Sequence, residues 1–111
     1  MTALTSPRLK VLVEESPGAP YTEYIVQTDN RDAVRFDLIR ERKGWPKATD
    51  APMVWMSVLA WHAIKRSGAT TDDVETYLDK IVDLVAVDEN NEPKRPDAAG
   101  RLEVGEAGPL A

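Results

Sequence analysis

The stretch PMVWMSVLAWHAIKR, residues 52–66, decides how this chain must fold. Every residue at positions 53–64 is apolar except Ser57 and His62. Pro52 suits the first turn of a helix, where its missing N–H costs nothing. The stretch therefore predicts a helix that is apolar on nearly every side, and such a helix has to be covered by other parts of a protein.

The length and composition of the chain limit what can cover this helix. The 111 residues make one domain at most, and the net charge of −5 argues against a nucleic-acid binder, which usually presents a basic face. The absence of cysteine excludes disulfides, a thiolate nucleophile and a cysteine-ligated zinc site. The apolar run is shorter than the roughly 18 residues of a membrane span, and the N-terminus lacks a signal-peptide pattern. We therefore expect a soluble intracellular protein that binds neither nucleic acid nor membrane.

Two segments before the helix have the pattern of strands. RLKVLVEES, residues 8–16, places Leu9, Val11 and Val13 on one side. YTEYIVQT, residues 21–28, is rich in β-branched and aromatic residues, and the SPGAP segment between the two is typical of a turn. Together they predict an N-terminal β-hairpin, which must pack against another element to be stable.

The ends of the two long helices are marked by capping residues. A helix is predicted over residues 31–43, with Asn30 as its N-cap and Gly44 at its C-terminal end. Thr49 or Asp50 is the predicted N-cap of the apolar helix that follows. The spacing therefore places two helices one after the other, with a short connection between them.

The third predicted helix starts after Thr70 and Thr71, and it has one apolar and one acidic side. Its apolar arc comprises Val74, Tyr77, Leu78, Ile81, Val82, Leu84 and Val85. Residues 88–111 are polar and rich in proline and glycine, so we expect a disordered tail after a domain of residues 1–87. The sequence thus predicts an α+β fold: an N-terminal β-hairpin followed by three helices and a disordered C-terminal tail.

The tryptophans of the apolar helix, Trp55 and Trp61, lie about 120° apart around its axis, so one flat neighbour cannot cover both. They are either ordinary core residues or part of a surface that a partner or a second copy buries, because aromatic and methionine-rich surfaces suit partner binding. We predict a partner-binding or self-association surface that comprises Val54, Trp55, Val58, Leu59, Trp61 and His62.

No motif in the sequence points to catalysis, a cofactor or a metal. His62 is the only histidine, and a lone histidine on a helix is more often structural or exposed than catalytic. Asp72 and Asp73 suit a helix N-terminus, and no glycine fits a phosphate-binding loop. The run DNRD, residues 29–32, lacks the glycine and the glutamate of a calcium loop. We therefore predict a non-enzymatic protein without catalytic, cofactor-binding or metal-binding residues.

A basic stretch at residues 31–47 has a net charge of +3, with acidic residues interleaved. Its basic residues are Arg31, Arg35, Arg40, Arg42, Lys43 and Lys47. We interpret it as a solvated helix face rather than a binding site. A helix-turn-helix interpretation of the last two helices fails, because the acids of the third helix would repel phosphates.

Several short motifs follow one another along residues 28–68. They are Asn30-Arg31-Asp32, Trp45-Pro46, Asp50-Ala51-Pro52, and a tryptophan-bearing segment from Trp55 through Trp61 to Lys65, Arg66 and Gly68. In this order they resemble the tail assembly chaperones of long-tailed, siphovirus-type phages, particularly those that infect actinobacteria. The resemblance covers about residues 8–85.

The resemblance implies a chaperone that binds the tape measure protein in the host cell cytoplasm while the tail tube assembles, with the tail tube protein as a second candidate partner. Many such chaperones have a longer form made by programmed ribosomal frameshifting, and they are absent from the finished virion. We also expect a homo-oligomer. The main alternative is a small structural or adaptor protein of the head–tail or tail that remains in the virion, where a symmetric assembly would bury the apolar helix permanently. A DNA-associated regulator is disfavoured by the acidic third helix.

Overall fold

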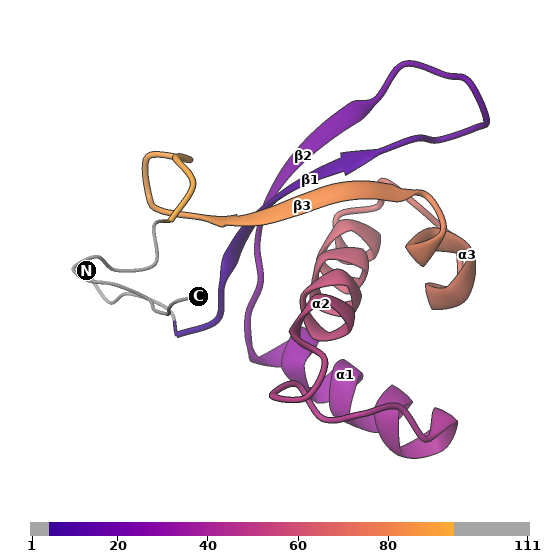
Figure 1. Ribbon diagram of the computed structural model, residues 1–111, viewed down its shortest axis with the longest axis vertical. Helices are drawn as coiled ribbons and strands as arrows, with labels where there is room; N and C mark the ends of the chain where they lie inside the picture. The colour runs from indigo at the N-terminus through magenta and orange to yellow at the C-terminus, as the bar shows by residue number, and fades with distance from the viewer. Residues whose placement is uncertain (1–4, 95–111) are drawn as a thin grey trace.

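The computed structural model describes residues 5–94 of the chain, which form an α+β fold (Figure 1). The elements are, in order, β1 (Arg8–Val13), β2 (Thr22–Gln27), α1 (Asn30–Lys43), α2 (Pro52–Arg66), α3 (Val74–Leu78) and β3 (Ile81–Val87). The strands make one antiparallel sheet, and the helices lie on one side of it.

Strand β1 is the middle strand of the sheet, which has the order β2-β1-β3. Val11 lies opposite Tyr24 on one neighbour and opposite Leu84 on the other. The predicted alternation is confirmed, because Leu9, Val11 and Val13 are fully buried on the side that faces the helices. The predicted hairpin is likewise confirmed as β1 and β2.

Helix α1 begins one residue earlier than predicted, because Asp29 rather than Asn30 is its N-cap. The Asp29 side chain accepts from the Arg31 N–H at 2.9 Å, and the Asp32 side chain reaches back to the Asp29 N–H at 2.9 Å. These two hydrogen bonds satisfy backbone donors that the first turn of a helix leaves free. Gly44 ends the helix with φ of 70°, a left-handed conformation that glycine adopts without strain.

The predicted cap of α2 is wrong. Neither Thr49 nor Asp50 takes this position: the N-cap is Ala51, which makes no side-chain hydrogen bond to the helix. Pro52 lies in the first turn as expected, and it removes one of the donors that a capping side chain would otherwise satisfy. The start of α2 therefore depends on packing more than on capping.

The third helix is much shorter than predicted, because α3 ends at Leu78 and residues 81–87 form strand β3. Ile81, Leu84 and Val85 have the spacing of a helical arc, and the strand accommodates this spacing through a register shift opposite Leu12 and Val13. The segment IVDLVAV is rich in β-branched residues, which favour strands. The free side of β1 offers these residues a full set of backbone hydrogen bonds, and this long-range pairing overrides the helical pattern.

The core lies between the sheet and the helices, with α2 at its centre. Helix α2 contacts α1, α3 and the sheet, so most of its apolar circumference is covered. The buried core comprises Leu9, Val11, Val13, Phe36, Ile39, Val58, Leu59, Ala60, Trp61, Ile64, Val74, Tyr77 and Leu84. The requirement that other elements surround the apolar helix is thus met largely within one chain.

The start of the predicted tail folds back on the sheet. Val87 forms a bridge with Pro93, and the Lys94 N–H donates to the Ala86 carbonyl at 3.0 Å. Residues 95–111, the rest of the predicted tail, lie outside the described residues. Across residues 5–94 no helix combines the length and the apolarity needed to cross a membrane.

Truncation of a side chain on the buried face of β1 should lower the free energy of unfolding much more than truncation on the opposite face. Leu9→Ala should lower the free energy of unfolding by about 3 kcal/mol, because it opens a cavity in the core. The matched change Leu12→Ala, on the half-buried opposite face, should cost less than about 1 kcal/mol. Urea unfolding followed by tryptophan fluorescence measures both. Equal losses for the two variants would contradict the described orientation of the strand.

Candidate functional site

The six residues of the predicted interaction surface separate into two groups. Val58, Leu59 and Trp61 are core residues, with exposed fractions of 0%, 0% and 5%, so the structure corrects their assignment to a surface. Val54, Trp55 and His62 are half-buried and keep some contact with solvent. These three residues belong to the core that α2 forms with the sheet, α1 and α3. The chain itself thus covers the apolar sides of α2 that a partner was expected to cover.

Trp61 is held in the core by polar as well as apolar contacts. Its Nε1–H donates to the Asp72 carbonyl at 2.9 Å, which satisfies the one polar atom of the side chain. The Lys65 ammonium lies 5.2 Å from the centroid of its ring, within cation–π range. Trp61 therefore ties the C-terminal half of α2 to the segment that leads into α3.

Trp55 is directed toward α1. It lines a shallow hollow together with Ala33, Phe36 and Arg40 of that helix, and it packs partly against the core. The two tryptophans thus contact different parts of the fold, as their angular separation on the helix predicts.

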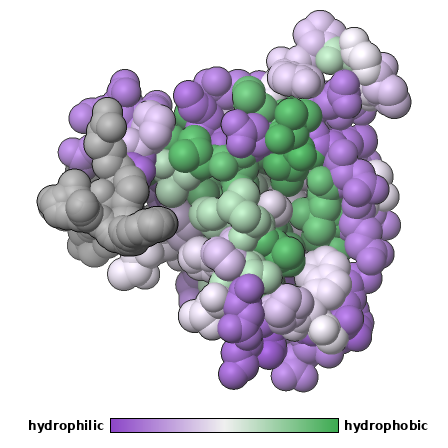
Figure 2. Space-filling model, viewed as in Figure 1, coloured by the Kyte–Doolittle hydropathy of each residue, from purple (hydrophilic) through white to green (hydrophobic). Residues whose placement is uncertain are grey.

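An apolar groove lies between the first turns of α2, the end of α3 and β3. We define the apolar groove by Met53, Val54, Ser57, Leu78, Ile81, Val82, Asp83 and Leu84, which enclose about 300 Å³. Two of its side chains, Met53 and Val82, are 54% and 46% exposed. Figure 2 shows hydrophobic surface gathered over β3 and α2 and bordered by hydrophilic residues. Of the predicted surface residues, only Val54 belongs to this groove.

The edge of β3 beside the groove is protected from another strand. Alternate residues of an antiparallel strand turn their backbone groups to one side, so Leu84 and Ala86 face away from β1. The Ala86 carbonyl accepts from the Lys94 N–H, and the Leu84 N–H donates to Oδ1 of Asp83 at 2.9 Å. These two contacts occupy part of the edge, so side-chain contacts are the more accessible way to use the apolar groove.

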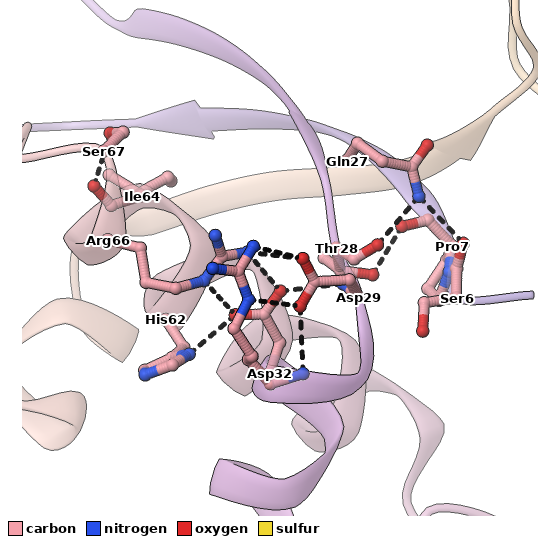
Figure 3. Close-up of polar contacts among 11 residues, drawn as sticks. Ser6, Pro7, Gln27, Thr28, Asp29, Asp32, His62, Ile64, Arg66 and Ser67 are labelled. Carbon is pink, nitrogen blue, oxygen red and sulfur yellow. Dashed lines mark hydrogen bonds and ion pairs between the residues drawn. The ribbon is translucent and has the colours of Figure 1, made fainter. Parts of the chain in front are cut away.

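A polar cluster surrounds Asp32 (Figure 3). The Asp32 side chain is 0% exposed, and Arg66 donates to both of its oxygens, from Nε at 3.0 Å and from Nη2 at 2.7 Å. Nδ1 of His62 lies 2.6 Å from Oδ1, and the Asp29 N–H donates to Oδ2. We call Asp29, Asp32, His62 and Arg66 the carboxylate cluster.

The hydrogen bonds of the cluster keep Asp32 ionised. Burial raises the pKa of this carboxyl, but hydrogen bonds from Arg66, from the Asp29 backbone and from His62 outweigh burial and hold the pKa below its ordinary value. A carboxylate only accepts, so Nδ1 of His62 carries a proton and donates it. Each oxygen thus has two donors, and the carboxylate has no lone pair left for a ligand. The cluster fastens α1 to α2.

The neighbouring Asp29 carboxyl is also held in its charged form. Hydrogen bonds from Arg31 lower its pKa to about 2, and Arg66 contributes at a distance of 3.6 Å. Asp29 lies closer to solvent than Asp32, so this pair adds little to stability. Within residues 5–94 there is no group of three or more His, Cys, Asp or Glu side chains that could hold a metal ion.

Part of the cluster was accessible to sequence reasoning. Asp29 and Asp32 have the spacing of a capping box, and His62 and Arg66 lie one turn apart on the same side of α2. What the sequence could not supply is the pairing of these helices across 30 and 34 positions.

Comparisons of this chain with protein-family models, with curated proteins and with solved structures find no match. Function is therefore inferred from the residues themselves.

The carboxylate cluster predicts a large and pH-dependent loss of stability on Asp32→Asn. Removal of the charge leaves Arg66 with only the more distant Asp29, which should cost about 2–3 kcal/mol at pH 7, less than for a fully buried pair because Arg66 is partly exposed. The lowered pKa means that the carboxylate stabilises the fold fully above the unfolded value of 3.8 and loses this effect as the pH falls through the lower folded value.

Urea unfolding of both proteins between pH 7 and pH 3 measures this effect. The difference between wild type and Asp32→Asn should be constant near neutral pH and should shrink toward pH 3. A difference that is small at pH 7, or that stays unchanged in acid, would show that the cluster does not stabilise the fold.

Proposed function

We propose that this protein is a phage tail assembly chaperone that binds the tape measure protein non-enzymatically while the tail tube forms. The ordered motifs in residues 28–68 support this proposal, because they are the part of the chain that resembles such chaperones. Three of the four motifs also contribute residues to defined features of the fold. Asn30-Arg31-Asp32 starts α1 and supplies the buried carboxylate, Pro52 starts α2, and Arg66 binds Asp32 at the end of α2.

The observation that carries the proposal is the apolar groove. A monomer that has covered most of α2 still leaves Met53 and Val82 about half exposed beside a hollow of about 300 Å³. Contiguous exposed apolar surface of this kind is typical of sites that bind other proteins. An amphipathic helix of a long, mostly helical client would bury its apolar side here, with methionine adapting to its shape.

The structural role of the carboxylate cluster also supports a binding role for the protein. The one histidine of the chain donates a hydrogen bond to Asp32, and the oxygens of Asp32 are fully occupied. These residues therefore connect α1 to the C-terminal half of α2, and the first turns of the same α2 carry Met53 and Val54 of the groove. A helix that is already fixed loses less conformational entropy on binding than a mobile one.

Two valines with the same exposure allow a matched test of the groove. Val82 in the groove and Val34 on α1 are both 46% exposed. Co-purification with the tape measure protein of the same phage should fall roughly tenfold for Val82→Asp, because a carboxylate would be buried against the client. Val34→Asp should leave co-purification nearly unchanged, and circular dichroism would verify that both variants fold.

A second matched pair lies outside β3, so it tests the groove independently of any folding defect that Val82→Asp causes in that strand. Met53 on α2 is 54% exposed in the groove, and Leu38 on α1 is 51% exposed outside it. Met53→Asp should weaken client binding, whereas Leu38→Asp should not. If the α1 variants lose the client and the groove variants retain it, the binding surface lies on α1 and the groove assignment is wrong.

A further inference from the structure

A basic cleft opens between α1, the C-terminal half of α2 and the start of α3, away from the apolar groove. It encloses about 410 Å³, and five basic side chains line it. We define the basic cleft by these side chains, which are Arg35, Arg42, Lys43, Lys65 and Arg66. Three of them belong to the stretch that the sequence suggested is only a solvated helix face, and the fold brings them opposite two cations of α2.

Only two of the five cations form ion pairs within residues 5–94. Lys43 lies 3.3 Å from Glu75, and Arg66 is bound to Asp32. Arg35, Arg42 and Lys65 form no ion pair with any of residues 5–94. The cleft thus has a surplus of positive charge in a protein whose net charge is −5.

The acidic residues at the cleft neutralise it only in part. Asp73 and Glu75 line it, and Asp32 is bound to Arg66. Asp72 lies outside the lining and is paired with Lys80 at 2.7 Å. Three carboxylates therefore act on five cations, which leaves a surplus of positive charge in the cleft.

The floor of the cleft is apolar and rigid. Ile39, Trp61 and Val74 line it and are 2%, 5% and 6% exposed, and Trp61 is fixed by its hydrogen bond to Asp72. Charges above a low-dielectric floor act more strongly on an approaching anion than charges on an open surface. The floor also accepts an apolar group of the ligand next to its charged ones.

We propose that the basic cleft binds an acidic segment of a partner protein. Arg35 and Arg42 are two helical turns apart, about 10.5 Å along α1. An extended chain advances about 3.3 Å per residue, and carboxylates two or four residues apart lie on one side of it, so glutamate side chains of such a segment can reach both guanidinium groups. A nucleic acid suits the cleft less well, because every nucleotide carries a phosphate, whereas an acidic protein segment can place uncharged residues beside Asp73 and Glu75, which form one wall. This inference does not depend on the proposed function of the apolar groove.

A titration of the full ¹⁵N-labelled chain with a capped octaglutamate peptide tests the proposal. The indole N–H signal of Trp61 and the backbone signals of Arg35 and Arg42 should shift, while those of Met53 and Val82 stay in place. Charge reversal in Arg35→Glu and in Arg42→Glu, each tested alone, should weaken binding roughly threefold or more. Lys47→Glu is the matched control, because Lys47 is exposed and lies outside the cleft. It should retain most of the affinity.

Several results would overturn the proposal. The first is the absence of shifts at the cleft at millimolar peptide, and the second is an equal loss of affinity in Lys47→Glu, which would indicate overall charge alone. Stronger shifts of the same signals with a single-stranded oligonucleotide of equal charge would assign the cleft to nucleic acid. Concentration-dependent shifts at the cleft without peptide would assign it to a second copy of the chain.

Discussion

The Asp32 carboxylate has no contact with water, and the arrangement of the two long helices depends on it. A buried charge is tolerated only when hydrogen bonds replace its lost solvation, and here the donors come from the Asp29 backbone, His62 and Arg66. Because the donors belong to two helices, α1 cannot slide or rotate on α2 without exposing an unpaired charge in the interior. The capping box at the start of α1 aims the carboxylate at these donors, so one residue both starts a helix and fixes its neighbour.

With α1 in place, the uneven coverage of α2 explains the surfaces that remain. The sheet, α1 and α3 cover Val58, Leu59 and Trp61, whereas the first turns of α2 extend past their neighbours and leave Met53 and Val54 beside β3. The same helix therefore serves as the core of the domain and as one wall of the apolar groove. Its C-terminal half forms a wall of the basic cleft, so apolar and charged openings are separated along one element.

The sequence predicted the elements whose signals are local and missed those that depend on distant partners. Alternation in β1 and the proline at the start of α2 are local, and the hairpin and both long helices were found. Ile81 and Leu84 are three residues apart, which fits a helix, and only the open side of β1 makes this segment a strand. The Asp32 cluster was missed for the same reason, because Arg66 lies 34 positions away. The apolar circumference of α2 suggested a wide interaction surface, since burial by the chain itself could not be read from α2 alone.

The most direct test of a chaperone role compares infected cells with purified virions of a phage that encodes this chain. Mass spectrometry would quantify the chain, the tape measure protein and the tail tube protein in both samples. A chaperone should co-purify with the tape measure protein from lysates collected during assembly and should be absent from the virions. A fixed number of copies in every virion would contradict the chaperone role and would identify the protein as a structural component of the particle.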